Sequence, residues 1–361
     1  MSTTLLTLRE RLQTMLGDDN LVYAKRYTRA INNAARELYP TYLFRRVTDE
    51  TLITGNALPN AHFEDWTSSS YPDFWTVSVV TAAEENTIIR GATSSIKLTS
   101  SAAGYAYCSE VEYPQLLDLM GITVTFKCWV LSDYATEARL GIYTKQADGT
   151  EQTTYSSYHS GGGEWELLEI EDYALNDDLV EIQFRLCMAG NQSSKTAYFD
   201  NARVTGKDFY AYLLPKTFQT GHITQVWEQV TGYSDDICDD VKSSHNAFAE
   251  TFGWNIITGD DGYKYLRLPY ILSSERKLRL VGEAPLEDTL SSDTDTMTIE
   301  GERVNLLLAY AAYLLYEMQR GVASGQSKDF YNQEIAYWGG KTERLKRTLK
   351  MTKPSGQIRW S

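Results

Sequence analysis

The residue types that most often carry out chemistry are few in this sequence and lie far apart. The four histidines, His62, His159, His222 and His245, lack the close spacing with which two residues ligate one metal ion. The sequence contains no GxSxG, HExxH, P-loop or dinucleotide-binding glycine pattern. The run SGGGEW (160–165) precedes no helical pattern, so it is not typical of a phosphate-binding loop. We therefore predict that the protein is not an enzyme.

The four cysteines, Cys108, Cys128, Cys187 and Cys238, show no CxxC spacing and have no histidine nearby. Two interpretations are open. A disulfide between Cys108 and Cys128 is possible, but buried reduced thiols in a reducing compartment are favoured.

Composition and charge argue against a membrane span and against sequence-specific reading of nucleic acid. The longest apolar stretch, 304–316, is shorter than the ~20 residues that span a bilayer, so no membrane association is predicted. Residues 1–54 carry 8 basic and 6 acidic groups, residues 55–207 carry 9 and 21, and residues 208–361 carry 17 and 21. Because the middle segment would repel a polyanion, we predict no sequence-specific reading of nucleic acid.

Helical periodicity is confined to the two ends of the chain. Leucines three and four apart predict helices over 4–16, which Gly17 ends, and over 21–38, with Asn20 as its cap. At the other end the pattern predicts helices over 302–319 and 328–350. Because the first two helices cannot bury their apolar faces alone, we infer that the helices of both ends form one domain.

Between the helices the pattern changes to β-structure. HITQVWEQV (222–230) alternates, and WNIITGDDGYKYLRL (254–268) predicts a hairpin with Asp-Asp-Gly at its turn. The predicted fold class is α+β multidomain. It combines a discontinuous helical domain of residues 1–54 and 208–361, with a β-hairpin region at 222–282, and an inserted all-β jelly-roll sandwich of residues 55–207.

Two segments show the alternation of the middle region most clearly. In VTFKCWVL (124–131), Val124, Phe126, Cys128 and Val130 point one way, whereas Lys127 and Trp129 point the other. In VEIQFRLCM (180–188), the predicted core residues are Val180, Ile182, Phe184, Leu186 and Met188, with Gln183 and Arg185 opposite. Short alternating strands separated by turns are typical of a sandwich or jelly roll.

Five pieces of this region occur in the order found in a known group of domains. They are NAHFEDW (60–66), SSIKLTS (94–100), GITVTFKCWVLSD (121–133), GEWELLEIE (163–171) and KTAYFDNARVTG (195–206). The segment resembles the galactose-binding-like carbohydrate-binding modules. The resemblance implies a possible structural calcium held by Glu64 and Asp200, since carboxylates are suitable ligands. The alternative is that Glu64 is a hydrogen-bonded residue at a strand end.

The same resemblance implies a carbohydrate-binding face, which requires aromatic rings beside polar donors. The candidate residues are Lys127, Trp129, Tyr143, Gln183 and Arg185, and Tyr155 and Tyr158 could join them. The alternatives are a mixed solvent face and a surface packed on a neighbouring subunit.

The flanking segments resemble the head–tail adaptor proteins of tailed bacteriophages, which form dodecameric rings below the portal and usually lack a sandwich. The resemblance is carried by ARELYP (35–40), WNIITGDDGYKYLRLP (254–269), RKLRLVGEAPL (276–286), LLLAYAAYLLYEMQ (306–319) and the basic tail. It implies a homo-oligomeric ring that contacts the portal and other neck or tail proteins. The tail residues Lys350, Lys353, Arg359 and Trp360 are candidates for docking to such a partner.

Together these patterns lead us to expect a structural virion protein at the neck, assembled in the host cytoplasm. Its sandwich would project outward for decoration, subunit packing or weak binding of a cell-surface glycan. The alternative is an oligomeric, lectin-like glycan-binding protein, or a tail or adhesion component.

Overall fold

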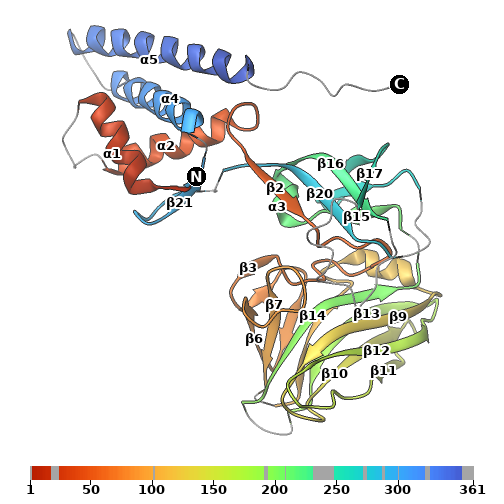
Figure 1. Ribbon diagram of the computed structural model, residues 1–361. Coiled ribbons are helices and arrows are strands. Elements are labelled where there is room, and N and C mark those ends of the chain that lie inside the picture. Colours follow the sequence, from red (N-terminus) through yellow and green to blue (C-terminus); the bar gives the residue numbers. More distant parts are fainter. Residues whose placement is uncertain are drawn as a thin grey trace. The chain divides into compact units, whose positions relative to one another are not determined.

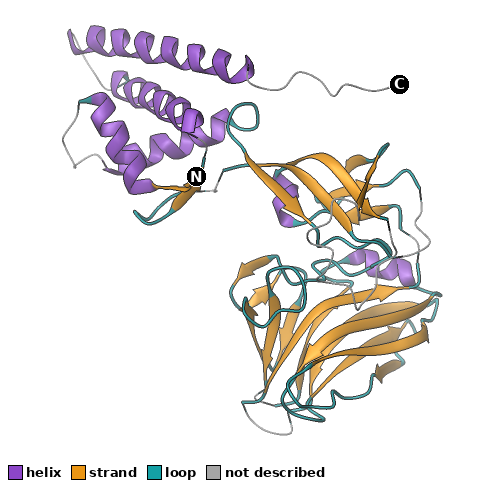
Figure 2. Cartoon of the chain, viewed as in Figure 1, coloured by secondary structure: helices purple, strands orange, loops and turns teal. Residues whose placement is uncertain are grey.

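The computed structural model describes most of the chain, which divides into two compact units (Figures 1 and 2). The described residues are 2–17, 24–100, 102–190, 194–207, 209–230, 248–270, 275–286, 289–299, 301–321 and 326–351. The first unit contains 1–47, 220–223 and 282–361, and the second contains 48–219 and 224–281. Asn20, Cys238 and His245 lie outside the described residues.

The first unit is helical. Its elements are α1 (Leu5–Leu16), α2 (Ala24–Leu38), α4 (Gly301–Arg320), α5 (Gln326–Met351) and the short antiparallel pair β1 (Ser2–Thr4) and β21 (Thr296–Thr298). The hydroxyl of Thr4 accepts a hydrogen bond from the backbone N–H of Thr7 and so caps α1. Gly17 ends α1 in the left-handed conformation, as the sequence predicts.

Helices from both ends of the chain share one hydrophobic core in this unit. Leu5, Leu8 and Leu12 of α1 pack in the same cluster as Leu307 and Leu308 of α4. The core also includes Ile31 and Leu38 of α2 and Trp338 of α5. No core residue of this cluster lies between positions 44 and 285, so the described core is built from the two chain ends alone.

The second unit contains an antiparallel β-sandwich of two five-stranded sheets (Figure 1). The first sheet has the order β11-β10-β13-β8-β5: β11 (Glu151–Tyr155), β10 (Ala138–Gln146), β13 (Leu179–Met188), β8 (Gly104–Ser109) and β5 (Thr76–Ser78). The second has the order β12-β9-β14-β7-β6: β12 (Trp165–Ala174), β9 (Thr123–Leu131), β14 (Thr196–Thr205), β7 (Ser95–Thr99) and β6 (Thr81–Glu85). Successive strands cross repeatedly between the sheets, which agrees with the predicted jelly roll.

The core of the sandwich follows the predicted alternation. Phe126 of β9 and Phe184 of β13 meet between the sheets, with ring centroids 5.3 Å apart. Val180 departs from the prediction, because its side chain is 47% exposed while Leu179 is buried. The strand register shifts at Lys145/Gln146, opposite this end of β13, and the shift reverses the inward and outward positions there.

Smaller elements complete the β-structure. They are β3 (Trp66–Ser68) with β4 (Tyr71–Pro72), the 3₁₀ helix η2 (Pro114–Leu119), α3 (Lys216–Thr220), the sheet of β15 (Ala211–Leu213), β19 (Lys264–Arg267) and β18 (Asn255–Thr258), and the sheet of β17 (Phe248–Thr251), β16 (His222–Gln229), β20 (Leu278–Ala284) and β2 (Arg45–Asp49). The hairpin of β18 and β19 confirms the predicted turn at Asp-Asp-Gly.

The sequence pattern predicts that residues 208–281 belong to the helical domain. In the structure most of these residues belong to the same compact unit as the sandwich. Hydrogen bonds of Lys216 are among the contacts that join this region to the segment that opens the sandwich. The backbone N–H of Lys216 donates to Asp65 at 3.0 Å, and its ammonium donates to Asp73 at 2.9 Å. Across the described helices, none is long and apolar enough to cross a membrane.

Candidate functional site

The outer face of the first sandwich sheet carries an arginine held between two tyrosines. The guanidinium of Arg185, on β13, lies 4.3 Å from the ring centre of Tyr105 and 4.2 Å from that of Tyr143. Its Nε donates to the side-chain oxygen of Gln183 at 2.8 Å. The side chain is only 9% exposed, so its charge is screened from water and its orientation is fixed. Two stacked rings and one hydrogen bond make it a rigid centre for the face.

Strand register places these residues side by side. Tyr143 lies opposite Gln183 across β10 and β13, and Arg185 lies opposite Tyr107 across β13 and β8. Tyr105 and Tyr107 are two residues apart on β8, and their rings meet edge-on with centroids 5.6 Å apart. The three central strands thus bring tyrosines, an arginine and an amide together on one surface, which we call the Arg185 face.

A second arginine extends the Arg185 face toward β11. The guanidinium of Arg139 lies 3.5 Å from the ring centre of Tyr155 and 4.5 Å from that of Tyr158. Gly141 lies between the two arginine clusters, and a Cβ there would come within 3.3 Å of the Tyr155 ring. Because Gly141 has no side chain, the ring of Tyr155 can pack close to the backbone of β10.

Burial and nearby charge decide which groups of this face ionise. Burial raises the pKa of the Cys187 thiol to about 12, although Arg139 and Arg185 oppose the shift. The thiol is therefore neutral and contributes packing rather than nucleophilic chemistry. Burial, then the charge of Glu112, raises the pKa of Tyr107, so its hydroxyl keeps its proton and remains a hydrogen-bond donor.

Two predicted carbohydrate-binding residues do not lie on the Arg185 face. Lys127 and Trp129 are on β9, in the opposite sheet, and point away from the core on the other side of the sandwich. Trp129 is buried under the guanidinium of Arg90, whose carbon lies 4.3 Å from the ring centre. Lys127 pairs with Glu169 at 3.2 Å. Alternation predicts that both point outward but cannot show which sheet holds each strand.

The predicted calcium ligands already accept protein donors. Oε1 of Glu64 accepts the backbone N–H groups of Thr93 and Ser94, both at 2.8 Å. Oδ2 of Asp200 accepts those of Arg90 and Gly91, also at 2.8 Å. The positive ends of these N–H dipoles occupy the directions from which a cation would approach.

The positions of the other possible metal-ligating side chains lead to the same conclusion. Among the described residues, no cluster of three or more His, Cys, Asp or Glu side chains has the geometry to hold a metal ion. Glu64 and Asp200 therefore do not fit a calcium site as they are placed. Calcium binding stays a prediction, to be decided by measurement.

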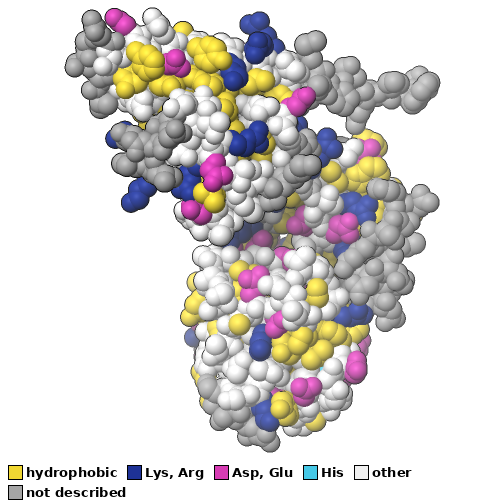
Figure 3. Space-filling model, turned by 60° about the vertical axis from the view of Figure 1, so that its left-hand side comes forward, with side chains coloured by type: hydrophobic (Ala, Val, Ile, Leu, Met, Phe, Trp, Pro, Cys, Tyr) yellow, Lys and Arg dark blue, Asp and Glu magenta, His cyan; other side chains and the backbone are white. Residues whose placement is uncertain are grey.

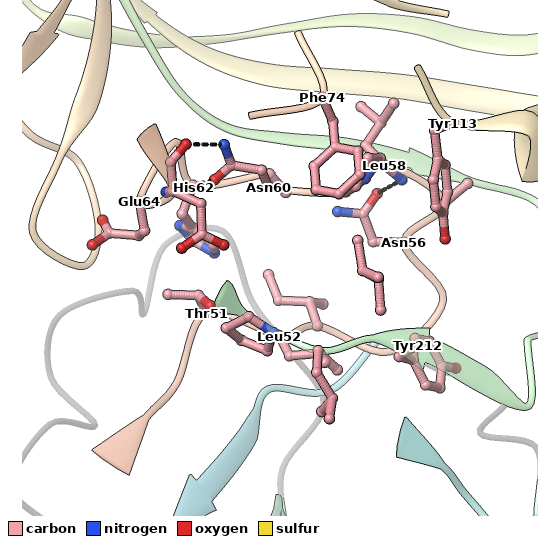
Figure 4. A pocket seen from close by; sticks show the side chains of 18 of the residues that line it. Thr51, Leu52, Asn56, Leu58, Asn60, His62, Glu64, Phe74, Tyr113 and Tyr212 are labelled. Atoms are coloured by element: carbon pink, nitrogen blue, oxygen red, sulfur yellow. Dashed lines mark hydrogen bonds between the residues drawn. The ribbon is translucent and has the colours of Figure 1, made fainter. Parts of the chain in front are cut away.

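A small cavity lies within the second unit, beside the segment that opens the sandwich (Figure 4). Phe74 and Tyr113 line one side of it, and Leu52 and Tyr212 line the other. Its volume is about 70 Å³, which is room for a few water molecules and too little for a sugar ring.

His62 is the polar group of this cavity that most requires a partner. Its side chain is 4% exposed, and neither ring nitrogen has a hydrogen-bond partner among the described residues. Nδ1 lies 3.7 Å from Oδ1 of Asp200. Nearby, burial raises the pKa of Asp65 to about 6, against the hydrogen bond from Lys216. The cavity is thus suited to structural water, which can satisfy His62.

Of the predicted docking residues, Lys350 lies in the last turn of α5, and Lys353, Arg359 and Trp360 lie outside the described residues. The sequence analysis missed three residues of the Arg185 face: Tyr105, Tyr107 and Arg139. The first two had a readable signal, because GYAYCS (104–109) alternates tyrosines with the core residues Ala106 and Cys108.

Comparison with known proteins gives structural likenesses only. No family model and no curated protein matches the chain. The C-terminal family 22 carbohydrate-binding module of Clostridium thermocellum Xyn10B is similar at 14% identity and a TM-score of 0.34, over 42% of this chain and 93% of that one. The CBM22-1 xylan-binding domain of Paenibacillus barcinonensis Xyn10C is similar at 13% identity and 0.33, over 45% and 97%. The enzymatically active domain of bacteriophage CBA120 tailspike protein 4 is similar at 11% identity and 0.33, over 42% and 22%.

Proposed function

We propose that the protein is a glycan-binding protein whose sandwich binds a carbohydrate chain on the Arg185 face. The observation that supports this most directly is the guanidinium of Arg185 between Tyr105 and Tyr143, with Gln183 bonded to it. Sugar recognition needs flat apolar surface for the ring and fixed donors for the hydroxyls. Tyr107 and Tyr143 offer the first, and Arg185 and Gln183 offer the second.

The proposed activity is binding without catalysis. The thiol on this face, Cys187, is protonated, and His159, in the loop after β11, has both ring nitrogens engaged: Nδ1 accepts from Gly161 N at 2.9 Å, and Nε2 lies 3.1 Å from the carbonyl oxygen of Glu164. A carbohydrate chain would lie across several strands of this face rather than enter the small cavity near His62.

Affinity electrophoresis of the full chain through gels that contain plant or bacterial polysaccharides tests this proposal. Retardation by at least one polysaccharide is expected, and Tyr143→Ala and Arg185→Ala should each weaken it about tenfold or more, since loss of one good contact costs ~1–2 kcal/mol. Lys127→Ala, on the opposite sheet, is the matched control. Equal loss in the control, or no retardation by any polysaccharide or glycan array, would refute the assignment.

A second candidate function, the head–tail adaptor ring subunit of a phage neck, is favoured by one feature of the helical unit. Phe330 and Tyr337 on α5 are 53% and 59% exposed, seven residues apart on one side of the helix. Figure 3 shows hydrophobic side chains along the visible face of this unit. Exposed aromatic side chains on one side of a helix suit packing on a neighbouring subunit.

In that case the protein would be a virion component made in the host cytoplasm, with the portal and tail proteins as partners. Native mass measurement of the purified chain, alone and mixed with a portal protein, separates the two candidates. A closed ring that binds the portal would favour the adaptor. A monomer or small oligomer that ignores the portal but is retarded by a polysaccharide would favour the glycan-binding protein.

A further inference from the structure

A groove on the helical unit is lined mainly by basic and polar side chains. Arg9 of α1 and Lys25, Arg29 and Arg36 of α2 contribute four positive charges to its lining. The groove encloses about 750 Å³ and is closed on one side by residues 289–291. Figure 3 shows Lys and Arg side chains on the visible face of this unit.

Hydrogen bonds fix the wall of the groove. The side-chain amide of Asn32 donates to the carbonyl oxygen of Leu290 at 2.9 Å and accepts from its backbone N–H at 3.2 Å. Arg36 donates to the hydroxyl of Thr289 at 2.8 Å. These bonds hold the segment against α2, so the groove is formed before any ligand arrives.

The cations of the groove lie in a row and differ in whether they already pair with other residues. Arg9 pairs with Asp293, whereas Lys25 and Arg29 are exposed and make no ion pair or hydrogen bond within the described part of the chain. Positions 25, 29 and 36 share one face of α2 and are separated along the axis by about 6 and 10 Å. Such a row matches a ligand with repeated negative charges better than a single anion.

The uncharged residues of the lining bear on which polyanion fits the groove, a chain of phosphates or an acidic protein segment. The side-chain amide of Asn33 lies among the cations, and such amides commonly bond phosphate oxygens, whereas the Thr28 hydroxyl already donates to the carbonyl oxygen of Ala24 at 3.0 Å. Ala24 and the buried Leu290 are the only apolar residues of the described lining. A groove without an apolar anchor site is poorly suited to an acidic segment of a folded protein partner.

We propose that this groove binds the sugar–phosphate backbone of a nucleic acid without reading its sequence. Arginine presents a planar fork that matches phosphate, and three of the four cations are arginines. No aromatic side chain belongs to the described lining, so the bases find no stacking surface. Because the whole chain carries a net charge of −14, binding should be weak and strongly salt-dependent.

Fluorescence anisotropy of the full-length chain with labelled oligonucleotides tests the proposal. Single strands and duplexes of about 20 nucleotides and several base compositions are titrated between about 50 and 200 mM NaCl. The test variant is Lys25→Gln/Arg29→Gln/Arg36→Gln. The control is Lys328→Gln/Arg344→Gln/Arg347→Gln on α5, which removes one lysine and two arginines and so changes the net charge equally.

The wild type should bind oligonucleotides of every composition alike. The test variant should bind at least about tenfold more weakly at the lowest salt, with a salt slope shallower by about two to three units, and the control should change little. Comparing the affinity for single strands with the affinity for duplexes shows which form of nucleic acid the groove prefers. Circular dichroism verifies folding, and Arg29→Glu alone, at an exposed position, replaces the triple variant if that fails to fold.

Three outcomes would overturn the proposal. One is the absence of oligonucleotide binding by the wild type at the lowest salt. Another is an equal loss in the α5 control, which would show long-range attraction rather than a groove. The last is binding of polyglutamate with no binding of either oligonucleotide form, which would assign the groove to an acidic protein segment.

Discussion

Arg203 of β14 and Glu275 form an ion pair at 3.2 Å that joins the sandwich to the segment preceding β20. The arginine side chain is 1% exposed, whereas the glutamate is 30% exposed. Removing the carboxylate leaves a buried guanidinium with a weaker partner, which costs more than exposing a carboxylate to water. Loss of the glutamate partner is therefore expected to cost more stability than leaving the glutamate itself unpaired.

Glu275→Gln should lower the free energy of unfolding by roughly 2–3 kcal/mol in urea denaturation. The double variant Arg203→Met/Glu275→Gln should recover part of that loss, because it removes the buried charge as well. A single variant within about 0.5 kcal/mol of wild type would show that the other contacts of Arg203 suffice.

The raised pKa of Asp65 predicts a pH-dependent stability. Between the unfolded value near 3.8 and the folded value of about 6, the folded chain holds a proton that the unfolded chain has lost. The stability contribution of Asp65 is therefore complete below pH ~4 and is lost as the pH rises through about 6. Asp65→Asn keeps an acceptor for Lys216 and cannot ionise, so at pH 7.5 it should be more stable than wild type by on the order of 1–2 kcal/mol.

The measurement is urea denaturation of both proteins at several pH values from 4.5 to ~7.5. The difference between their free energies of unfolding should grow from about pH 4.5 to about 6 and level off above that pH. Parallel pH profiles would mean that Asp65 ionises normally in the folded protein.

The contacts of Glu64 and Asp200 predict that calcium does not stabilise the protein. Adding millimolar calcium or a chelator should leave the midpoint of thermal unfolding unchanged within about 1 °C. A ligand at a hundred times its dissociation constant would add about 2.7 kcal/mol and raise the midpoint by several degrees. Such a rise, lost in Glu64→Gln/Asp200→Asn, would establish the calcium site that the sequence resemblance implies.

The shared core of the terminal helices predicts that the helical unit folds without the sandwich. A chain in which residues 48–281 are replaced by a flexible Gly/Ser linker should retain a helical circular dichroism spectrum and cooperative thermal unfolding. Leu307→Ala in that shortened chain should cost roughly 3–5 kcal/mol, because the side chain is fully buried in the core. Loss of all helical signal in the shortened chain itself would contradict an insertion between the two chain ends.

Sequence periodicity was sufficient for the elements and for the direction of most side chains. Leucine spacing located α1 and α4 to within one residue at each end, and strand alternation placed Gln183 and Arg185 on an outward face. A side chain's direction depends on its own strand, so local pattern carries that information.

The grouping of residues into a site could not be obtained in the same way. Trp129 and Arg185 have equivalent positions in equally regular patterns, yet they lie on opposite sheets. Their separation depends on pairings between strands far apart in sequence, such as β13 with β8. Long-range pairing leaves no mark in a single local pattern, so the alternation in 104–109 shows that Tyr105 and Tyr107 point outward but not that they lie beside Arg185.

The joint core of α2 and α4 also governs the order in which the protein can fold during synthesis. More than 250 residues separate the end of α2 from the start of α4, and a ribosome needs on the order of ten to fifty seconds to add them. Throughout that interval the first two helices lack the partners that cover their apolar stripes, while the entire sandwich emerges and can fold. The sandwich can therefore fold before the helical core is complete, and the apolar faces of α1 and α2 stay uncovered until α4 is synthesised.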